Sequence, residues 1–325
     1  MEQFFSQFLD FALTAVSLGM TFLYGCTGEI LTEKAGHLNL GIPGIMCMGG
    51  ACGCLTLKLL NQSGLPPVLL VLLTLLASFI GGMLMGIIYS FLTVTLKANQ
   101  NVTGLAMTIF GAGTTKFIMS GISSATEAFQ NYLYAKNYFR FPFGGNTSAL
   151  NYNGIMVFLA IAIALIAAFV LNKTRAGLHL RAVGENPATA DAVGINVTRY
   201  KYVATCIGSG IAALGGLFYI MGWSGTCDAY KSIEQLGWIS IALVIFTLWR
   251  PQISIIGSAL FGLLYLAGTR IPTLLGIQFD MSVTKLLEIL PYAVTIIVLI
   301  VTSVGKKKEN QPPAALGLPY FREER

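Results

Sequence analysis

The stretch VLLVLLTLLASFIGGMLMGIIYSFLTVTL, from Val68 to Leu96, contains no charged residue, and it exceeds the ~20 apolar residues that a membrane-spanning helix requires. The rest of the chain has a similar character. Of its 325 residues 55% are hydrophobic and only 10% are charged, and the mean hydropathy is +0.72. Soluble domains carry about 25% charged residues. The composition therefore excludes a soluble enzyme and a nucleic-acid-binding domain, and it indicates a polytopic membrane protein.

Further apolar runs lie on both sides of this stretch, separated by charged residues. One charged side chain at the centre of a membrane helix costs about 2.5–3.5 kcal/mol, so each run is expected to end where charges begin. We predict an all-α transmembrane bundle of about nine spans, within a range of roughly eight to ten. Small residues one helical turn apart, as in Gly82-xxx-Gly86 and Gly208-xxx-Ala212-xxx-Gly216, predict close helix packing. The predicted spans are Phe11–Gly28, Leu38–Leu57, Val68–Leu96, Val102–Gly121, Tyr152–Asn172, Tyr202–Gly222, Gln235–Trp249, Pro251–Thr269 and Leu286–Gly305.

The basic residues predict how the bundle lies in the membrane. With the C-terminus inside, 13 of the 20 Lys and Arg residues fall in inner loops and the remaining 7 fall in outer loops. Cytoplasmic loops carry an excess of these residues, so we predict that the N-terminus is outside and the C-terminus is inside. Residues 1–305 then form the transmembrane domain, with a cytoplasmic loop over 173–201. Residues 306–325 form a cytoplasmic tail.

The segment GEILTEKAGHLNLGIPG, from Gly28 to Gly44, begins with charged residues and then becomes rich in glycine and apolar residues. Its charges, on Glu29, Glu33 and Lys34, are expected at the cytoplasmic surface. Non-helical backbone at membrane depth is tolerated only where protein buries it or a wet cavity satisfies it. We predict a broken or re-entrant element over 36–50; the alternative is a glycine-rich packing helix.

Interrupted helices tend to mark the substrate path in transporters. On that basis Asn39, Gly41 and Gly44 are candidate residues of a path through the bundle. The single histidine of this segment, His37, is interpreted as a residue at the membrane interface rather than as a metal ligand or a proton relay.

The loop 173–201 is the longest predicted cytoplasmic connection, and its core reads GENPATADAVG, from Gly184 to Gly194. Asn186 is a favourable N-cap, Pro187 suits a first helical turn, and Gly194 supplies a C-terminal stop. These signals predict a two-turn helix, which is too short to be stable alone. It is either an ordinary surface helix or a rigid peg that inserts into a cytoplasmic partner.

The outer segment Ile122–Asn151 is rich in aromatic residues. Aromatic side chains of this kind commonly form a belt at the membrane interface. The alternative is an amphipathic surface helix that docks an extracytoplasmic protein.

Residues for catalysis or metal binding are not apparent in the sequence. The six cysteines lie in or next to apolar runs, where cysteine packs as a small apolar residue, and no disulfide or metal framework emerges. The chain also lacks the Gly-x-x-x-x-Gly-Lys-Ser/Thr loop that holds nucleotide phosphates. We therefore expect no enzyme activity and no cofactor on this chain, and an energy-driven role would need a separate motor.

Together these segments resemble the integral-membrane permease family of ABC importers that serve branched-chain amino acids, ribose-type sugars and nucleosides. The segment Gly28–Gly44 is similar to the N-terminal signature of that family, although Lys34-Ala-Gly36 stands where the family favours Arg-Ser-Gly. The segment Gly184–Gly194 is similar to its cytoplasmic coupling motif. The tail from Pro312 to Arg325 most resembles the nucleoside branch.

The resemblance implies a subunit of the cytoplasmic (inner) membrane that contacts lipid and binds no nucleic acid. Its partners would be a second permease subunit, forming a heterodimer, a cytoplasmic ATPase that hydrolyses ATP, and an extracytoplasmic substrate-binding protein. The coupling residues implied are Glu185, Asn186, Pro187, Ala190, Asp191 and Gly194.

The resemblance of the tail to the nucleoside branch implies a nucleoside substrate, a purine nucleoside in particular, and the charge-poor spans permit such a neutral polar substrate. Ribose-type sugars fit the same composition, whereas a zwitterionic amino acid would prefer helix termini or fixed charges. Two other classes of protein stay open from the residues alone, a self-contained facilitator or channel and a non-transporting membrane scaffold.

Overall fold

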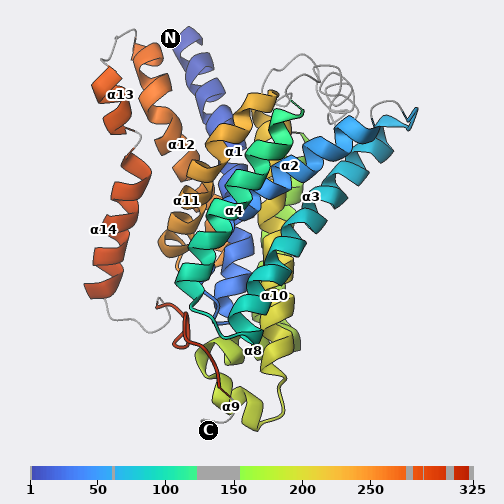
Figure 1. Cartoon of the computed structure of the whole chain (residues 1–325). Coiled ribbons are helices and arrows are strands. Elements are labelled where there is room, and N and C mark those ends of the chain that lie inside the picture. The colour runs from blue at the N-terminus through green and yellow to red at the C-terminus, as the bar shows by residue number, and fades with distance from the viewer. Residues whose placement is uncertain are drawn as a thin grey trace.

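The computed structural model describes residues 2–60, 63–122, 154–275, 281–287, 289–304 and 311–321, and every regular element in these ranges is helical. Figure 1 shows long helices running side by side, with the short helices α8 and α9 at one end of the bundle and the N-terminus at the other. The all-α class is therefore confirmed for the described residues. In chain order the elements are α1 (Glu2–Lys34), α2 (Ile42–Leu60), α3 (Pro67–Ser90), η1 (Phe91–Thr95), α4 (Gln100–Ser120), α7 (Ile155–Lys173), α8 (Arg175–Glu185), α9 (Pro187–Ala192), α10 (Val197–Leu217), η2 (Phe218–Ser224), η3 (Cys227–Ala229), α11 (Tyr230–Phe246), α12 (Pro251–Leu275), α13 (Met281–Leu287) and α14 (Leu290–Val304).

Seven helices in the described ranges are long and apolar enough to cross a membrane. The remaining two predicted spans fall on α11, with 17 residues, and α14, with 15 residues. Both are shorter than the ~20 residues that a bilayer requires of a straight helix, so the prediction of nine spans is not confirmed. The seven are Phe5–Lys34, Ile42–Leu60, Val68–Thr95, Gln100–Ser120, Ile155–Lys173, Val197–Ser224 and Pro251–Gly268.

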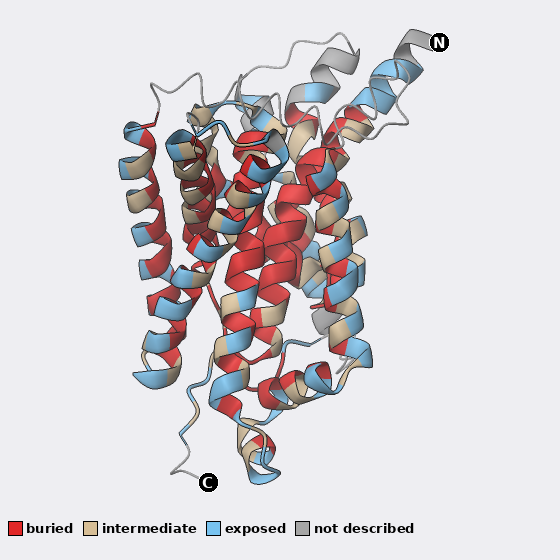
Figure 2. Ribbon diagram, turned by 90° about the vertical axis from the view of Figure 1, so that its right-hand side faces the viewer, coloured by how far each residue is buried: buried red, intermediate tan, exposed pale blue. Residues whose placement is uncertain are grey.

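Helix α10 lies among α1, α2 and α3 and packs against all three through small residues. An added Cβ at Gly208 would overlap the backbone of Gly28 in α1, and one at Gly216 would overlap the backbone of Met46 in α2. Gly82 of α3 meets α10 in the same way. The close packing predicted from the small-residue spacing is confirmed, and Figure 2 shows the resulting column of buried residues at the centre of the bundle.

The predicted break lies between α1 and α2, and it is shorter than expected. Residues 35–41 are not helical, whereas α2 is one continuous helix from Ile42 in spite of its glycines. Those glycines face neighbouring helices, as Gly44 does where it lies against the backbone of Thr108 in α4. The helix therefore continues because its small residues serve packing, and the prediction of a broken element as far as residue 50 is wrong.

The predicted positions of the charged residues before the break are also wrong. Helix α1 does not end at Gly28, and Glu29 and Glu33 are almost fully buried, at 0% and 3% exposure. Each carboxylate has a donor within the bundle: the backbone N–H of Asn39 donates to Glu29 Oε1 over 2.9 Å, and the indole N–H of Trp249 donates to Glu33. Burial is tolerated because these hydrogen bonds replace water.

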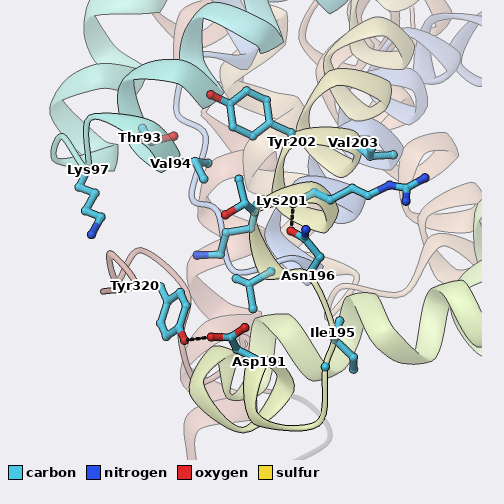
Figure 3. A pocket seen from close by; sticks show the side chains of 14 residues that line it. Thr93, Val94, Lys97, Asp191, Ile195, Asn196, Lys201, Tyr202, Val203 and Tyr320 are labelled. Atoms are coloured by element: carbon cyan, nitrogen blue, oxygen red, sulfur yellow. Dashed lines mark hydrogen bonds between the residues drawn. The ribbon is translucent and has the colours of Figure 1, made fainter. Parts of the chain in front are cut away.

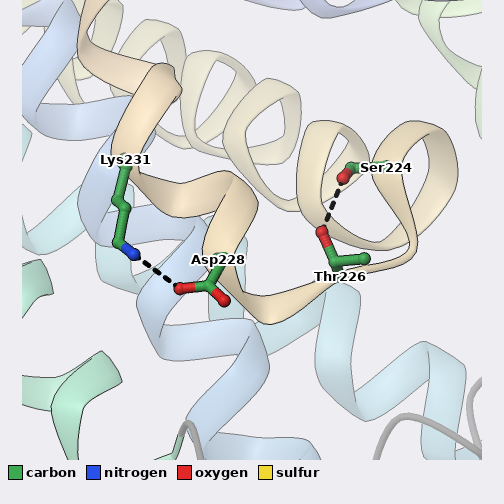
Figure 4. Close-up of polar contacts among 4 residues, drawn as sticks. All are labelled: Ser224, Thr226, Asp228 and Lys231. Carbon is green, nitrogen blue, oxygen red and sulfur yellow. Dashed lines mark hydrogen bonds and ion pairs between the residues drawn. The ribbon is translucent and has the colours of Figure 1, made fainter.

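The connection from η2 to α11 is exposed and polar (Figure 4). The hydroxyl oxygens of Ser224 and Thr226 lie 2.8 Å apart, and Lys231 Nζ lies 2.7 Å from a carboxylate oxygen of Asp228. Because both members of this ion pair are exposed to water, the pair contributes little to stability. The stability of the bundle depends on the buried contacts between helices.

Replacing Gly216 with alanine tests the central packing. The added Cβ would overlap the Met46 carbonyl oxygen, and we expect a loss of about 1–3 kcal/mol, the usual cost of overpacking. The measurement is the midpoint of thermal unfolding of the purified protein in detergent. Gly113 of α4 is the matched control, because an added Cβ there meets nothing within 4 Å. A G216A protein as stable as the G113A protein would show that the helices are not in close contact.

Candidate functional site

The connection between α7 and α10 contains two helices, α8 and α9, rather than the single helix predicted. Thr174 caps the start of α8, where its hydroxyl accepts a hydrogen bond from the backbone N–H of Gly177 over 3.1 Å. At the other end of α8, Gly184 lies so close to α1 that a Cβ would overlap the Lys34 carbonyl oxygen. Helix α8 therefore rests directly on the end of α1. The amphipathic pattern of residues 175–185 was the signal that could have revealed it.

The predicted helix after α8 is present as α9, and the residues predicted to begin and end it do so. The side-chain oxygen of Asn186 accepts a hydrogen bond from the backbone N–H of Thr189 over 3.0 Å, and Pro187 occupies the first turn. Gly194 has a φ of +86°, a left-handed conformation that residues with a Cβ rarely adopt. Two turns of helix thus begin and end at fixed residues, and the predicted limits of this helix are confirmed.

The six predicted coupling residues fall into an anchor and an exposed part. Ala190 is 2% exposed and packs with Val183 and Val197, which belong to α8 and α10. The exposed part is available to a partner, while the anchor fixes the helix to the bundle. Of the remaining predicted residues, Glu185, Asn186 and Gly194 are exposed and Pro187 and Asp191 are half-buried.

The tail 311–321 also belongs to this site, which the sequence did not reveal. The hydroxyl of Tyr320 donates a hydrogen bond to Asp191 Oδ2 of α9 over 2.8 Å (Figure 3). The backbone N–H of Ala315 donates to the Gly184 carbonyl over 3.0 Å, and that of Gly317 donates to the Gly36 carbonyl over 3.3 Å. The tail therefore joins α9 to the break between α1 and α2.

The backbone of the break is held by side chains from two other helices, α3 and α4. The Leu38 N–H donates to Gln100 Oε1 over 2.8 Å, and the Leu38 carbonyl accepts from the Tyr89 hydroxyl over 2.7 Å. The Leu40 carbonyl accepts from the Thr108 hydroxyl over 2.8 Å. Contacts of this kind satisfy polar backbone groups away from water. The backbone of the break is therefore fixed in place by hydrogen bonds to neighbouring helices.

The candidate path residues lie in this break and at the start of α2. Asn39 is fully buried, and its Oδ1 accepts a hydrogen bond from the backbone N–H of Gly41 over 3.0 Å. Gly41 and Gly44 both face α4, at Gly104 and at Met107–Thr108. The structure thus brings the three residues together at the contact between α2 and α4. Their role in a path stays a prediction.

His37 is buried, which contradicts its predicted place at the membrane interface. It is 1% exposed, its Nδ1 lies 3.0 Å from the Thr205 hydroxyl oxygen, and its ring meets that of Tyr89 edge-on. Burial lowers the pKa of His37 well below its ordinary value, and the positive charge of Lys201 adds to the shift. The ring is therefore neutral at pH 7 and acts as a hydrogen-bonding group between the break and α10.

Within the described ranges, no three His, Cys, Asp or Glu side chains are grouped so that they could hold a metal ion. The outer aromatic segment lies outside the described residues from residue 123 to residue 153. What the described site offers is a short exposed helix that is joined to the break through α8 and the tail.

Comparison with known proteins agrees with a transport role. A sequence model of the family described as branched-chain amino acid transport system / permease component matches residues 1–299. The nucleoside ABC transporter permease NupC of Lactococcus lactis is 30% identical over 285 residues, which are 85% of this chain and 87% of that protein. The guanosine ABC transporter permease NupQ of Bacillus subtilis is 30% identical over 311 residues, 92% of each chain. A Haloferax volcanii protein named as a candidate glucose ABC transporter permease, TsgC13, is 30% identical over 241 residues, which are 73% of this chain and 70% of that protein.

Replacing Tyr320 with phenylalanine tests whether the tail holds α9. The variant removes only the hydroxyl that bonds Asp191, and the loss of about 1 kcal/mol should speed amide hydrogen exchange in residues 186–196 roughly fivefold. Tyr202→Phe is the matched control, since the Tyr202 hydroxyl lies 2.5 Å from the Thr95 hydroxyl oxygen instead. Exchange is measured by mass spectrometry on the purified protein. Equal exchange rates in the two variants would show that the tail does not restrain α9.

Proposed function

We propose that this protein imports nucleosides. The chain belongs to the family of branched-chain amino acid transport system permease components, and it is an ABC transporter permease of the cytoplasmic membrane. Purine nucleosides are the substrates that we favour, because NupQ is named for guanosine, which is a purine nucleoside. NupC, which is named for nucleosides, is similar over most of its length. Ribose-type sugars are the second candidate class, supported by the relative named for glucose.

Several uncharged polar groups inside the bundle suit a neutral substrate. Buried hydroxyl groups on Thr21, Thr27 and Thr115 have no hydrogen-bond partner among the described residues. Hydroxyl groups can donate to and accept from a base or a sugar without carrying a charge. We propose that Asn39, Gly41 and Gly44 line the path, and that the contact between α2 and α4 opens when substrate passes.

The orientation that we propose has the N-terminus outside and the C-terminus inside, with α11 and α14 crossing the membrane as the seventh and ninth of nine spans. The N-terminus and α9 lie at opposite ends of the bundle (Figure 1). The basic residues of α8 and of the neighbouring loops lie at the α9 end, as expected for cytoplasmic segments. An ATPase in the cytoplasm would then meet α9.

The observation that carries the coupling proposal is that α9 is exposed on one side and anchored to the bundle on the other. We propose that a partner ATPase contacts the segment Glu185–Gly194 and that nucleotide-driven motion of the ATPase displaces it. The displacement reaches the break through Ala190, Gly184 and the tail. A second permease subunit and an outer substrate-binding protein complete the proposed importer, and ATP is hydrolysed by the partner.

Replacing Gly194 with valine tests the coupling role and the cytoplasmic position of α9. A β-branched residue at φ +86° is strained by at least about 1–2 kcal/mol, which should disturb the end of α9 and lower ATP-dependent uptake by about tenfold or more. Gly64→Val is the control, because Gly64 is also left-handed, at φ +66°, and lies in the loop between α2 and α3. Uptake by cells is normalised to the amount of each variant in the membrane. Normal uptake by G194V would refute the coupling proposal.

Competition for uptake tests the substrate class. In cells that carry the gene and in cells that lack it, uptake of a labelled purine nucleoside is measured with excess unlabelled pyrimidine nucleoside, ribose, glucose or leucine. We expect gene-dependent uptake that purine nucleosides suppress and leucine does not. Suppression by ribose or glucose alone would show that the substrate is a sugar. Transport by the purified chain alone in liposomes without ATP would show a facilitator instead.

A further inference from the structure

A cavity of about 630 Å³ lies beside α9, and it is separate from the proposed substrate path. It is bounded by the end of η1, by the first turns of α10, by the end of α9 and by the tail (Figure 3). Exposed residues such as Gly194 and Asn196 form part of its wall, so the cavity opens to the α9 end of the protein. Its volume is within the range of about 300–1,000 Å³ that small-molecule sites occupy.

Lys201 is the most unusual group in this cavity. Its side chain is only 3% exposed, and Figure 3 shows its ammonium group directed to the side of the cavity where Lys97 and Tyr320 lie. No hydrogen bond or ion pair joins that ammonium group to any residue that the structure describes. An ammonium group that has lost most of its water without gaining an acceptor in the protein is costly. The cavity therefore contains a strong donor that lacks an acceptor.

The other polar groups of the cavity supply further donors. Lys97 and Arg199 add two positive charges, against the single carboxylate of Asp191, which already accepts a hydrogen bond from Tyr320. Nearby His37 adds no further positive charge, because burial and the charge of Lys201 lower its pKa. Hydroxyl groups complete the lining, on Thr93, Thr198, Tyr202 and Tyr320. Those of Thr93 and Tyr320 already donate, to the Tyr89 carbonyl and to Asp191, and they can offer a ligand only their oxygen lone pairs. This set of groups is matched to an anion with several acceptor oxygens.

We propose that the cavity binds a phosphate-bearing anion, with Lys201 as its central partner and Lys97 as a second one. A phosphate group offers three acceptor oxygens and up to two negative charges, which suits ammonium groups and hydroxyl donors together. The phosphate could belong to a small phosphate ester in the cytoplasm or to the headgroup of an anionic lipid, since Val203 on the rim of the cavity is exposed and apolar. The site does not depend on the identity of the transported substrate.

Ligand-dependent stability of the full chain tests the proposal without any transport assay. The protein is reconstituted in nanodiscs of phosphatidylcholine, and its unfolding midpoint is followed while inorganic phosphate or adenosine monophosphate is added. A second series replaces part of the lipid with phosphatidylglycerol. We expect a concentration-dependent rise of the unfolding midpoint. The Lys201→Met substitution should weaken binding of the anion by about tenfold or more.

The stability of the Lys201→Met variant without anion distinguishes binding from a structural role. Without anion, K201M should be at least as stable as the parent protein, because it removes a buried unpaired charge. Lys173→Met is the matched control, since Lys173 is exposed at the end of α7 and lies outside the cavity. A response to the free phosphates identifies a soluble ester, and a response only to phosphatidylglycerol identifies a lipid. No response to either, or an undiminished response in K201M, overturns the proposal.

Discussion

A helix that stops inside an apolar bundle frees backbone N–H and C=O groups that must find partners there, and this constraint shapes the present structure. The break between α1 and α2 meets it with side chains from distant parts of the chain. Glu29 and Tyr89 each bond one backbone group, Gln100 and Thr108 bond two more, and Asn39 bonds within the break itself. Such a segment has few alternative shapes, because moving it would leave several polar groups unsatisfied at once.

The same break supports the end of the protein where α8 and α9 lie. Gly36 accepts a hydrogen bond from the tail, and Gly184 of α8 lies against the last residues of α1. Helix α9 is therefore connected to the break by two routes, one through α8 and one through Tyr320. A displacement of α9 would act on the segment where the candidate path residues lie. In this way a helix of 6 residues can be linked to the interior of a much larger bundle.

Local signals in the sequence predicted local structure well. The cap at Asn186, the proline after it and the left-handed Gly194 act within one turn of the chain, and they fixed α9 before any contact was known. The apolar runs predicted the positions of the long helices, because each run is also a local property of the chain. The small-residue spacing also predicted packing, since it repeats along a single helix face.

Charge was a poor guide inside the bundle. Glu29 and Glu33 were expected at the surface, because the sequence does not show that Asn39 and Trp249 supply donors to them. The contact between Tyr320 and Asp191 joins residues that are 129 positions apart, so no local pattern could indicate it. The roles of Asn39, Gly41 and Gly44 are undecided for a related reason, because a buried glycine in a helix contact and one beside a path have the same sequence signature.

The position of the tail has a consequence for biosynthesis. Residues 311–321 leave the ribosome after every helix that they contact, and they bond to Gly36, Gly184 and Asp191. The surface around α9 is therefore assembled last, once the membrane helices have been inserted. Until the tail has been synthesised, α9 is held by the packing of Ala190 against α8 and α10, without the hydrogen bond from Tyr320.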